Sequence, residues 1–195
     1  MTRETERELI EKAGKGDRQA AATLIQHHQG SLYSYLLRLS GRPDMAEDIA
    51  QDAFVRVLAH IERFDTRFRF STWLFTIAKR LYVNANQKLK PHYDSDIVGS
   101  ARGKRGTPDL PASADERRDR SRDAVQDALT ALSLTQREVF LLFHQQDWSI
   151  AMIAQHCSMP EGTVKSHLHR ARRRMKKFIE GDEQLSASVV EVWAG

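Results

Sequence analysis

Cysteine is nearly absent from this sequence of 195 residues, in which Cys157 is the only one. A single cysteine cannot form an intramolecular disulfide, which excludes a disulfide-stabilised fold and favours a reducing compartment. No apolar run approaches the roughly 18 residues that a membrane-spanning helix needs. The first 30 residues also lack the apolar stretch of a signal peptide. We therefore expect a cytoplasmic protein without direct membrane insertion.

Catalytic motifs are missing as well. The sequence has neither a glycine-rich phosphate loop nor a nucleophile elbow. Glu47, Asp48 and Asp52 could in principle serve a divalent-metal nuclease, but no convergent acidic partner accompanies them. Three histidines and the cysteine lack the paired spacing of zinc ligands; they are His156, Cys157, His167 and His169. We expect a protein that is not an enzyme, with no metal, no cofactor and no small-molecule substrate.

The apolar residues recur every three to four positions without the alternation of a strand, which predicts an all-α protein. Charged residues make up 29% of the chain and apolar residues 41%. This balance suits two small helical cores better than one large core. Helices are expected at about 4–14, 17–39, 44–63, 71–89, 119–132, 135–146, 149–157 and 161–180.

Residues 91–118 interrupt this pattern with three prolines and three glycines. A segment without an apolar period cannot bury enough surface to offset the entropy lost on ordering. We therefore expect a flexible linker at 91–118 between a helical domain at 1–90 and a second at 119–180. A C-terminal tail follows at 181–195.

Two helix starts carry possible capping signals. Asp44 is followed by Glu47 at the spacing of an N-terminal capping box, and Thr135 is followed by Glu138 in the same way. We expect each pair to begin a helix.

The segments 149–157 and 161–180 predict a helix-turn-helix. The break contains Pro160, and the second helix places an apolar stripe on one side: Val164, Leu168, Ala171, Met175 and Phe178/Ile179. Its other face carries the polar and cationic residues Lys165, Ser166, His169, Arg170, Arg173, Lys176 and Lys177. Such a face suits the major groove of DNA, where the first residues reach base edges and later cations neutralise phosphates. A merely solvated charged face is the alternative.

The stretch FRFSTWLFTIAKR at 68–80 combines aromatics with cations. One stripe of the expected helix is apolar and is assigned to the core: Phe70, Trp73, Leu74, Ile77, Ala78 and Leu81. A second stripe consists of Thr72, Phe75, Thr76, Lys79, Tyr82, Val83 and Asn86, with Arg80 and Asn84 nearby. Aromatics beside cations suit single-stranded nucleic acid, because bases stack on the rings. The alternative, a second buried face against a neighbouring helix, stays open at this point.

The helix expected at 44–63 has an acidic, amide-bearing side. Asp48, Gln51, Asp52 and Val55 share this side, and Phe54 and Leu58 project on a flank. Such a face is a poor DNA surface, because phosphates are repelled by carboxylates. It suits docking of a basic helix from a protein partner.

Both modules together resemble an extracytoplasmic-function (ECF) sigma factor of the sigma-70 family. The segment DMAEDIAQDAFVRVLAHIERFD…FRFSTWLFTIAKRL resembles the sigma-2 domain. The segment LSLTQREVFLLFHQQDWSIAMIAQHCSMPEGTVKSHLHRARRRMKKFI resembles the sigma-4 domain. The resemblance covers about three quarters of the chain, with the two motif sets in the family's order and a linker between them.

The resemblance implies partners, roles and a mechanism. Core RNA polymerase would bind through its β′ clamp helices and β flap, and promoter DNA would be read at the −35 element and read and melted at the −10 element. Docking on the clamp helices is assigned to Asp48, Gln51, Asp52 and Phe54. Contacts with the −10 element are assigned to Phe75, Lys79, Arg80, Tyr82 and Asn84. Contacts with the −35 element are assigned to Thr163, Lys165, Ser166, His169, Arg170 and Arg173. An anti-sigma factor is the expected regulatory partner.

At a few positions the sequence departs from the family pattern. These residues affect which promoter sequence would be recognised, and not the class of protein that the resemblance implies. Arg80 and Asn84 stand where the family commonly has an asparagine and an aspartate, and Ser158 replaces the usual glycine of the turn. His169 stands where a larger aromatic or polar residue is frequent. A DNA-binding regulator that works without polymerase is the second hypothesis, with the N-terminal domain serving as a dimerisation or sensing module.

Overall fold

The computed structural model describes residues 1–89 and 114–180. Within these ranges the chain forms helices and no strand, so the all-α prediction is confirmed. In chain order the elements are α1 (Arg3–Gly14), α2 (Arg18–Ser40), α3 (Pro43–Ala59), the 3-10 turn η1 (Ile61–Arg63), α4 (Phe70–Leu89), α5 (Ala114–Thr130), α6 (Leu134–His144), α7 (Ile150–Cys157) and α8 (Glu161–Glu180).

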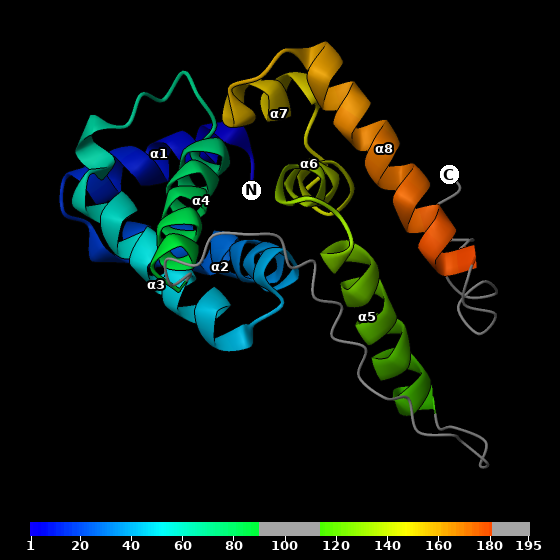
Figure 1. Cartoon of the computed structure of the whole chain (residues 1–195). Helices are drawn as coiled ribbons and strands as arrows, with labels where there is room; N and C mark the ends of the chain where they lie inside the picture. The colour runs from blue at the N-terminus through cyan, green and yellow to red at the C-terminus, as the bar shows by residue number, and fades with distance from the viewer. Residues whose placement is uncertain (90–113, 181–195) are drawn as a thin grey trace.

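Helices α1 to α4 form an N-terminal domain around α2, which contacts each of the other three (Figure 1). The buried side of α2 follows the helical period, with Leu24, Leu32, Leu36 and Leu39 at most 1% exposed. Burial of each leucine contributes roughly 1.5–3 kcal/mol. The apolar pattern thus predicts the element and the face that it buries.

Helices α5 to α8 form the C-terminal domain, in which α6 packs against α8 and α7 bridges them (Figure 1). Helices α7 and α8 make the predicted helix-turn-helix. Ser158 ends α7 in the left-handed region, at φ 52° and ψ 46°. Glycine adopts this conformation at little cost and serine does not, which explains why glycine is usual at this turn.

The two domains lie in contact, with α2 against α5 and α6 and α4 against α7. Arg137 of α6 contributes to this contact through hydrogen bonds from its guanidinium. It donates to the carbonyls of Leu39 (2.7 Å), Leu129 (2.7 Å) and Thr130 (3.1 Å). The last carbonyls of a helix carry partial negative charge and lack partners within the helix. One cation therefore satisfies the C-terminal ends of α2 and α5 together.

The observed helix ends differ from the predicted ones in two places. The helix expected at 44–63 ends at Ala59, and His60 leads into η1. Helix α5 begins at Ala114, so the last residues of the expected linker 91–118 are helical. The missing apolar period does not exclude a helix where alanine, glutamate and arginine, which have high helix propensity, are frequent. The rest of that linker and the tail 181–195 lie outside the described residues.

Both predicted capping pairs are wrong. Helix α3 starts one residue earlier, with Pro43 in its first turn, and Asp44 binds the Arg42 guanidinium at 2.7 Å. Helix α6 is capped by Ser133, which forms the capping box with Gln136. A proline supplies a fixed φ that suits the first helical turn. The shift at α6 leaves Glu138 free for contacts in the interior.

We expect Gly41→Ala to lower the free energy of unfolding by about 1–2 kcal/mol. Gly41 follows α2 in the left-handed region at φ 72°, and a Cβ there would lie 3.3 Å from Nε2 of Gln126. Urea unfolding measures the effect. Gly30→Ala is the matched control, because Gly30 is in the interior of α2 with open space beside it; it should stabilise by about 0.5–1 kcal/mol. Equal effects of the two substitutions would contradict the strain argument.

Candidate nucleic-acid interface and interdomain cluster

The outward face of α8 carries the residues predicted to read DNA. Lys165, Ser166, His169, Arg170 and Arg173 are exposed, and Thr163 is half-buried at the start of the helix. On the inner side, four apolar residues are buried: Val164, Leu168, Ala171 and Met175. The structure therefore confirms the predicted division between a cationic outer face and an apolar inner face.

Contacts within α8 itself hold two of its cations. The Arg170 guanidinium donates to Oγ of Ser166 at 2.8 Å and to its backbone carbonyl at 3.2 Å, which aligns the side chain along the helix. Near the C-terminal end, Lys176 pairs with Glu180 at 3.5 Å, and both are largely exposed. Among the described residues, no ion pair joins Lys165 or Arg170 to an internal carboxylate. Both cations can therefore meet phosphates or bases.

The acidic side of α3 is also exposed. Asp48, Gln51 and Asp52 face solvent, and beside them Val55 is 67% exposed. Phe54, in contrast, is only 8% exposed and belongs to the core. The prediction that Phe54 projects on the flank is therefore wrong. An apolar ring next to the core residues Ala53 and Val57 gains more from burial than from solvent exposure.

The expectation that Phe75 and Tyr82 lie on an open nucleic-acid face is wrong for this structure. Phe75 is 1% exposed, with its ring 5.0 Å from that of Tyr35 and 5.3 Å from that of Trp148. Tyr82 is 6% exposed, and its hydroxyl donates to the carbonyl of Leu39 at 3.4 Å. Helix α4 is covered on two sides, by α3 and by α2 together with the C-terminal domain. The buried alternative therefore holds for these two aromatics.

Other residues of α4 remain accessible. Arg80 and Asn84 are exposed, and Trp73 is half-buried with its ring stacked on that of Phe64 at 4.9 Å. The Trp73 side chain lies at the edge of the core rather than in it. Of the five residues predicted to contact the −10 element, Arg80 and Asn84 are therefore the two with exposed side chains.

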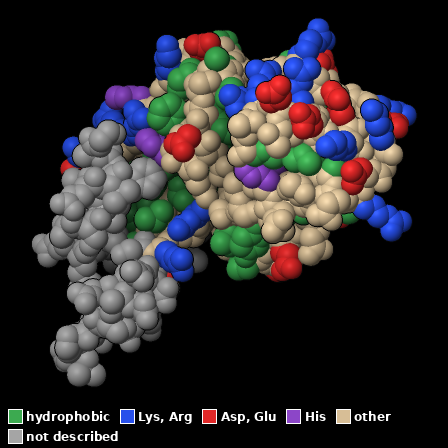
Figure 2. All heavy atoms as spheres, turned by 180° about the vertical axis from the view of Figure 1, so that it is seen from behind, with side chains coloured by type: hydrophobic (Ala, Val, Ile, Leu, Met, Phe, Trp, Pro, Cys, Tyr) green, Lys and Arg blue, Asp and Glu red, His purple; other side chains and the backbone are tan. Residues whose placement is uncertain are grey.

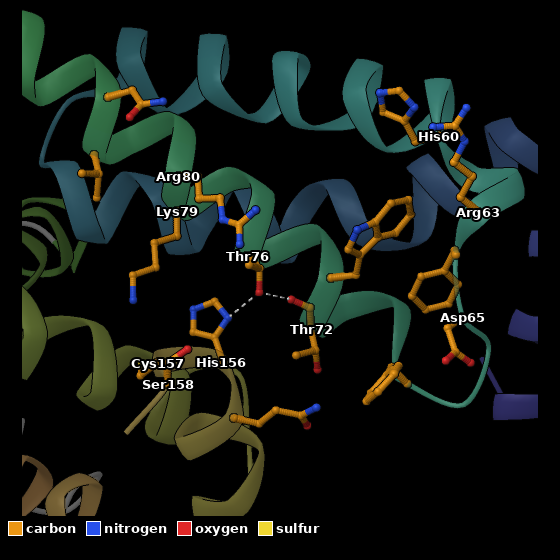
Figure 3. A pocket seen from close by; sticks show the side chains of 16 residues that line it. His60, Arg63, Asp65, Thr72, Thr76, Lys79, Arg80, His156, Cys157 and Ser158 are labelled. Atoms are coloured by element: carbon orange, nitrogen blue, oxygen red, sulfur yellow. Dashed lines mark hydrogen bonds between the residues drawn. The ribbon is translucent and has the colours of Figure 1, made fainter. Parts of the chain in front are cut away.

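Lys79, the remaining predicted contact, belongs to a polar cluster between the domains. Its ammonium group lies 2.8 Å from Oε1 of Glu138, a buried carboxylate of α6. Nε2 of His156, on α7, donates to the same oxygen at 3.0 Å. Nδ1 of His156 lies 3.0 Å from the hydroxyl of Thr76. Figure 3 shows His156 pointing from α7 toward Thr76 on α4.

Thr76 links the histidine to α4. The Thr76 hydroxyl donates to the carbonyl of Thr72 at 2.7 Å, and its oxygen lies 3.0 Å from Nδ1 of His156. The interface between the domains therefore holds a buried carboxylate, with the Lys79 ammonium group and the His156 ring at the same oxygen.

The cluster changes the acidity of two of its members. Burial by itself would raise the pKa of Glu138, but the hydrogen bond from His156 and the charge of Lys79 outweigh it, and the pKa is lowered. The pKa of the Cys157 thiol is raised to about 12, mainly by burial and also by the negative charge of Glu138. Glu138 is thus ionised at neutral pH, and Cys157 is a protonated, unreactive thiol.

Glu138, His156 and Cys157 each bring one donor atom within 4.8 Å of the others. The sequence did not single out Glu138 as a neighbour of the histidine and the cysteine. Lys79 stands at the same carboxylate oxygen, and its positive charge would repel a metal ion placed there. The arrangement therefore fits an internal ionic network.

A pocket of about 850 Å³ lies beside this cluster. Its wall on the N-terminal side includes Trp73, Arg80 and Asn84, and its wall on the C-terminal side includes Gln155 and Ser158. Figure 3 shows the labelled residues of both walls around one hollow. Three of the predicted −10 residues, Lys79, Arg80 and Asn84, therefore line the pocket opposite residues of α7.

The face seen from behind the view of Figure 1 has a mixed surface. In Figure 2, acidic and basic side chains are interspersed over the half that is formed by α1 to α4. Such a mixture does not make the single-sign stripe that nucleic-acid binding favours. None of the described helices is long and apolar enough to span a membrane.

Two residues of the interface were missed by sequence reasoning. Trp148, which is 5% exposed, packs its ring 5.3 Å from both Phe75 and His156. Glu138 was interpreted as a capping residue, although it pairs with Lys79 of the other domain and with His156 of its own domain. The sequence did contain a signal that Glu138 is buried, because this residue directly precedes the apolar run of α6. Only the approach of the N-terminal domain supplies the partner Lys79.

Two family models match the chain in separate segments. Sigma-70 region 2 matches residues 24–90, and Sigma-70, region 4 matches residues 122–175. The first segment contains α3 and α4, and the second contains α6, α7 and most of α8. The exposed faces described above lie within these two segments.

Two curated proteins are similar over most of their length. ECF RNA polymerase sigma factor SigW of Bacillus subtilis (strain 168) is 32% identical over 182 residues, which cover 87% of this chain and 94% of SigW. ECF RNA polymerase sigma factor SigL of Mycobacterium tuberculosis (strain ATCC 25618 / H37Rv) is 32% identical over 158 residues, which cover 80% of this chain and 87% of SigL.

Two solved structures have the same fold. CnrH, solved in complex with the cytosolic domain of CnrY, has a TM-score of 0.69 at 21% identity and covers 92% of this chain and 99% of its own. The sigma factor RpoE of Bartonella quintana, solved in complex with the anti-sigma factor NepR, has a TM-score of 0.63 at 25% identity. That match covers 83% of this chain and 98% of RpoE.

Proposed function

The chain belongs to the extracytoplasmic-function group of the sigma-70 family, and on that premise we propose how its surfaces direct transcription. It is an RNA polymerase sigma factor that binds core polymerase and starts transcription at specific promoters. It is not an enzyme, because polymerisation is carried out by the core. The observation that carries the proposal is a pair of exposed faces of opposite charge, acidic on α3 and cationic on α8. They lie in the two family domains, which follow each other in the expected order.

Docking on core polymerase is assigned to α3. Asp48, Gln51 and Asp52 offer carboxylate and amide oxygens to the basic clamp helices of the β′ subunit, and Val55 supplies apolar contact. Phe54 supports this face from the core instead of touching the partner. The C-terminal domain meets the β flap.

Reading of the −35 element is assigned to the outer face of α8. Thr163, Lys165 and Ser166 lie in the first turns, where a recognition helix reaches base edges. His169, Arg170 and Arg173 follow further along the exposed face and contact bases or phosphates. Each good bidentate base contact is worth about 1–3 kcal/mol of discrimination.

Reading of the −10 element is assigned to the accessible part of α4. Arg80 and Asn84 are exposed for polar contacts with DNA, and Lys79 joins them when it leaves Glu138. Phe75 and Tyr82 are not assigned to DNA contact, because both side chains are buried. The wall of the pocket that belongs to the N-terminal domain, around Trp73, is the candidate place for a base flipped out of the non-template strand.

An anti-sigma factor is the proposed regulatory partner. RpoE, the relative of known structure at 25% identity, was solved in complex with the anti-sigma factor NepR. A sigma factor acts on polymerase inside the cell, and we assign this chain to the cytoplasm.

Run-off transcription tests the proposal. We expect transcripts from a cognate promoter only when core polymerase and this protein are both present. The template is selected by co-purifying the protein with core polymerase and sequencing the bound promoters. Core polymerase alone on the same template is the control. Equal transcription with and without the protein would contradict the proposed function.

A free-standing DNA-binding regulator is the second candidate, supported by the exposed cationic face of α8. It would bind duplex promoter DNA tightly and with strong salt dependence in the absence of core. A gel shift with and without core separates the two functions. Specific binding by the free protein that is unchanged by core would favour the regulator.

A further inference from the structure

Within the C-terminal domain, the end of α6 holds one of the arginines of α8. The two helices pack against each other (Figure 1). Nε of Arg172, on α8, donates to Nε2 of His144 at 3.1 Å. The same guanidinium lies over the ring of Phe143, with its central carbon 5.1 Å from the ring centroid. The last two residues of α6 therefore contact this cation together, one by a hydrogen bond and one by a cation–π interaction.

His144 is suited to hold an arginine. A guanidinium cannot accept a hydrogen bond, so Nε2 of His144 is the acceptor and carries no proton. Burial lowers the pKa of His144 and the charge of Arg172 lowers it further, whereas Asp147 acts in the opposite direction. The imidazole is therefore neutral at neutral pH. Its ring is packed 4.6 Å from that of Phe140 and 5.0 Å from that of Phe143, which fixes the direction of the acceptor.

Arg172 lies at one edge of the cationic face of α8. It follows His169 by three positions and precedes Lys176 by four, and residues at these spacings lie on the same side of a helix. All three side chains are exposed. The phosphate backbones run along both edges of the major groove, beside a helix that reads the bases from within it. An arginine at the edge of such a helix therefore suits a phosphate better than a base.

The contact with His144 leaves most of the guanidinium available. Nε–H is one of five N–H groups of an arginine, and the other four are on the two terminal nitrogens. Among the described residues, His144 is the only hydrogen-bond partner of Arg172. The terminal nitrogens can therefore bind two oxygens of one phosphate, which is the geometry that arginine favours with this anion.

We propose that Phe143 and His144 are positioning residues for DNA binding, which hold Arg172 as a phosphate contact beside the −35 element. This inference rests on the proposed function, because it extends the surface that would bind that element from α8 to the end of α6. A long side chain that is free in solution loses conformational freedom when it binds, and this loss weakens the contact. Phe143 and His144 restrict Arg172 before DNA arrives, so less freedom is lost on binding.

Promoter binding at several salt concentrations tests the phosphate contact. The probe is the promoter duplex recovered with core polymerase, and holoenzyme formed from core and the full chain binds it in a fluorescence anisotropy titration. Arg172→Ala should weaken binding roughly fivefold at about 0.15 M salt and reduce the slope of log K against log salt by about 0.9, as expected for one lost phosphate contact. Duplexes with altered −35 sequences should show the same loss, because phosphates carry no sequence information. An unchanged slope, or a loss confined to one −35 sequence, would overturn the phosphate contact.

Arg174→Ala is the matched control. Arg174 is exposed two residues further along α8, and its guanidinium donates to Gln136, near the start of α6, at 3.4 Å. The substitution removes the same charge from the same helix. We expect the slope to stay unchanged and the affinity to stay within about twofold, because salt screens charges that do not touch DNA. If Arg174→Ala reduces the slope as much as Arg172→Ala does, net charge governs binding and the proposal is wrong.

Two substitutions of His144 test the positioning. Glutamine keeps an acceptor oxygen in place of Nε2, and alanine does not. His144→Ala should weaken promoter binding about two- to fivefold with little change of the salt slope, because Arg172 keeps its charge but loses its restraint. His144→Gln should retain most of the affinity. In a chain that already carries Arg172→Ala, His144→Ala should have no further effect. A merely structural role of His144 would weaken binding equally with and without Arg172.

NMR spectroscopy of the free full chain tests the positioning without DNA. The Nε proton of Arg172 should give a signal that exchanges slowly with water, because it is hydrogen-bonded, and the signal is assigned by its absence in Arg172→Ala. It should be lost in His144→Ala and kept in His144→Gln. The same signal in His144→Ala and the unmodified chain would overturn the positioning. Failure of the unmodified holoenzyme to bind any promoter would overturn the proposed function and the phosphate contact. Normal promoter binding that none of these substitutions changes would overturn this inference alone.

Discussion

Replacement of Phe75 by alanine is expected to lower the free energy of unfolding by about 3–5 kcal/mol. The side chain is 1% exposed and fills the space between Tyr35 and Trp148. Truncation removes the buried ring and leaves a cavity that its neighbours cannot fill completely. Since domains of this size are stable by only about 5–15 kcal/mol, a large share of the total would be lost. Urea unfolding followed by circular dichroism measures the change.

Phe68→Ala is the matched control for this experiment. Phe68 precedes α4 and is 49% exposed, so its loss should change the free energy of unfolding by less than about 1 kcal/mol. A base-stacking role at Phe75 would predict the reverse, namely normal stability with weaker promoter binding. If Phe75→Ala is as stable as Phe68→Ala, the interpretation of Phe75 as a core residue is wrong.

Asp48→Arg is expected to weaken binding to core polymerase by about 2–3 kcal/mol, or roughly 30- to 150-fold. Asp48 is exposed on α3 beside Gln51 and Asp52. The substitution removes a carboxylate from the docking face and adds a cation that repels basic clamp helices. Arginine has high helix propensity, so α3 should remain folded. Fluorescence titration of labelled protein with core measures the affinity, and Gln51→Ala should give a smaller loss in the same direction.

Glu11→Arg controls for the change in net charge. Glu11 is exposed on α1, away from the acidic side of α3, and the substitution changes the charge by the same amount. We expect its core affinity to stay within about threefold of the unmodified chain at physiological salt, because screening weakens distant surface charges. Equal losses in Asp48→Arg and Glu11→Arg would mean that overall charge, rather than the α3 face, governs binding.

Much of the candidate interface could be predicted because it depends on one helix at a time. The outer cations of α8 and the acids of α3 follow from the helical period, which separates polar from apolar residues around a single axis. Lys165, Arg170, Asp48 and Asp52 are all exposed as the spacing predicts. For these residues the nearest neighbours are on the same helix or in solvent.

Helix α4 shows that the helical period alone cannot predict which side of a helix is buried. Its aromatic residues fall on more than one side, and a period of 3.6 cannot say whether a second apolar side meets solvent, DNA or another helix. Phe75 and Tyr82 are buried because α2 and Trp148 cover that side. Phe54 differs from its prediction for the same reason, since the flank on which it lies is covered in the folded domain.

The amino-acid sequence alone determined the class of this protein: all-α, two helical domains, a helix-turn-helix and the motifs of a sigma factor. These properties follow from local periodicity and from residue order along the chain. Only the tertiary structure decided that Glu138 meets Lys79 and His156 and that Phe75 meets Trp148. Glu138 and His156 are 18 residues apart within one domain, and the other two pairs join residues of different domains. Their contacts depend on how the helices pack and how the domains meet, which no local pattern encodes.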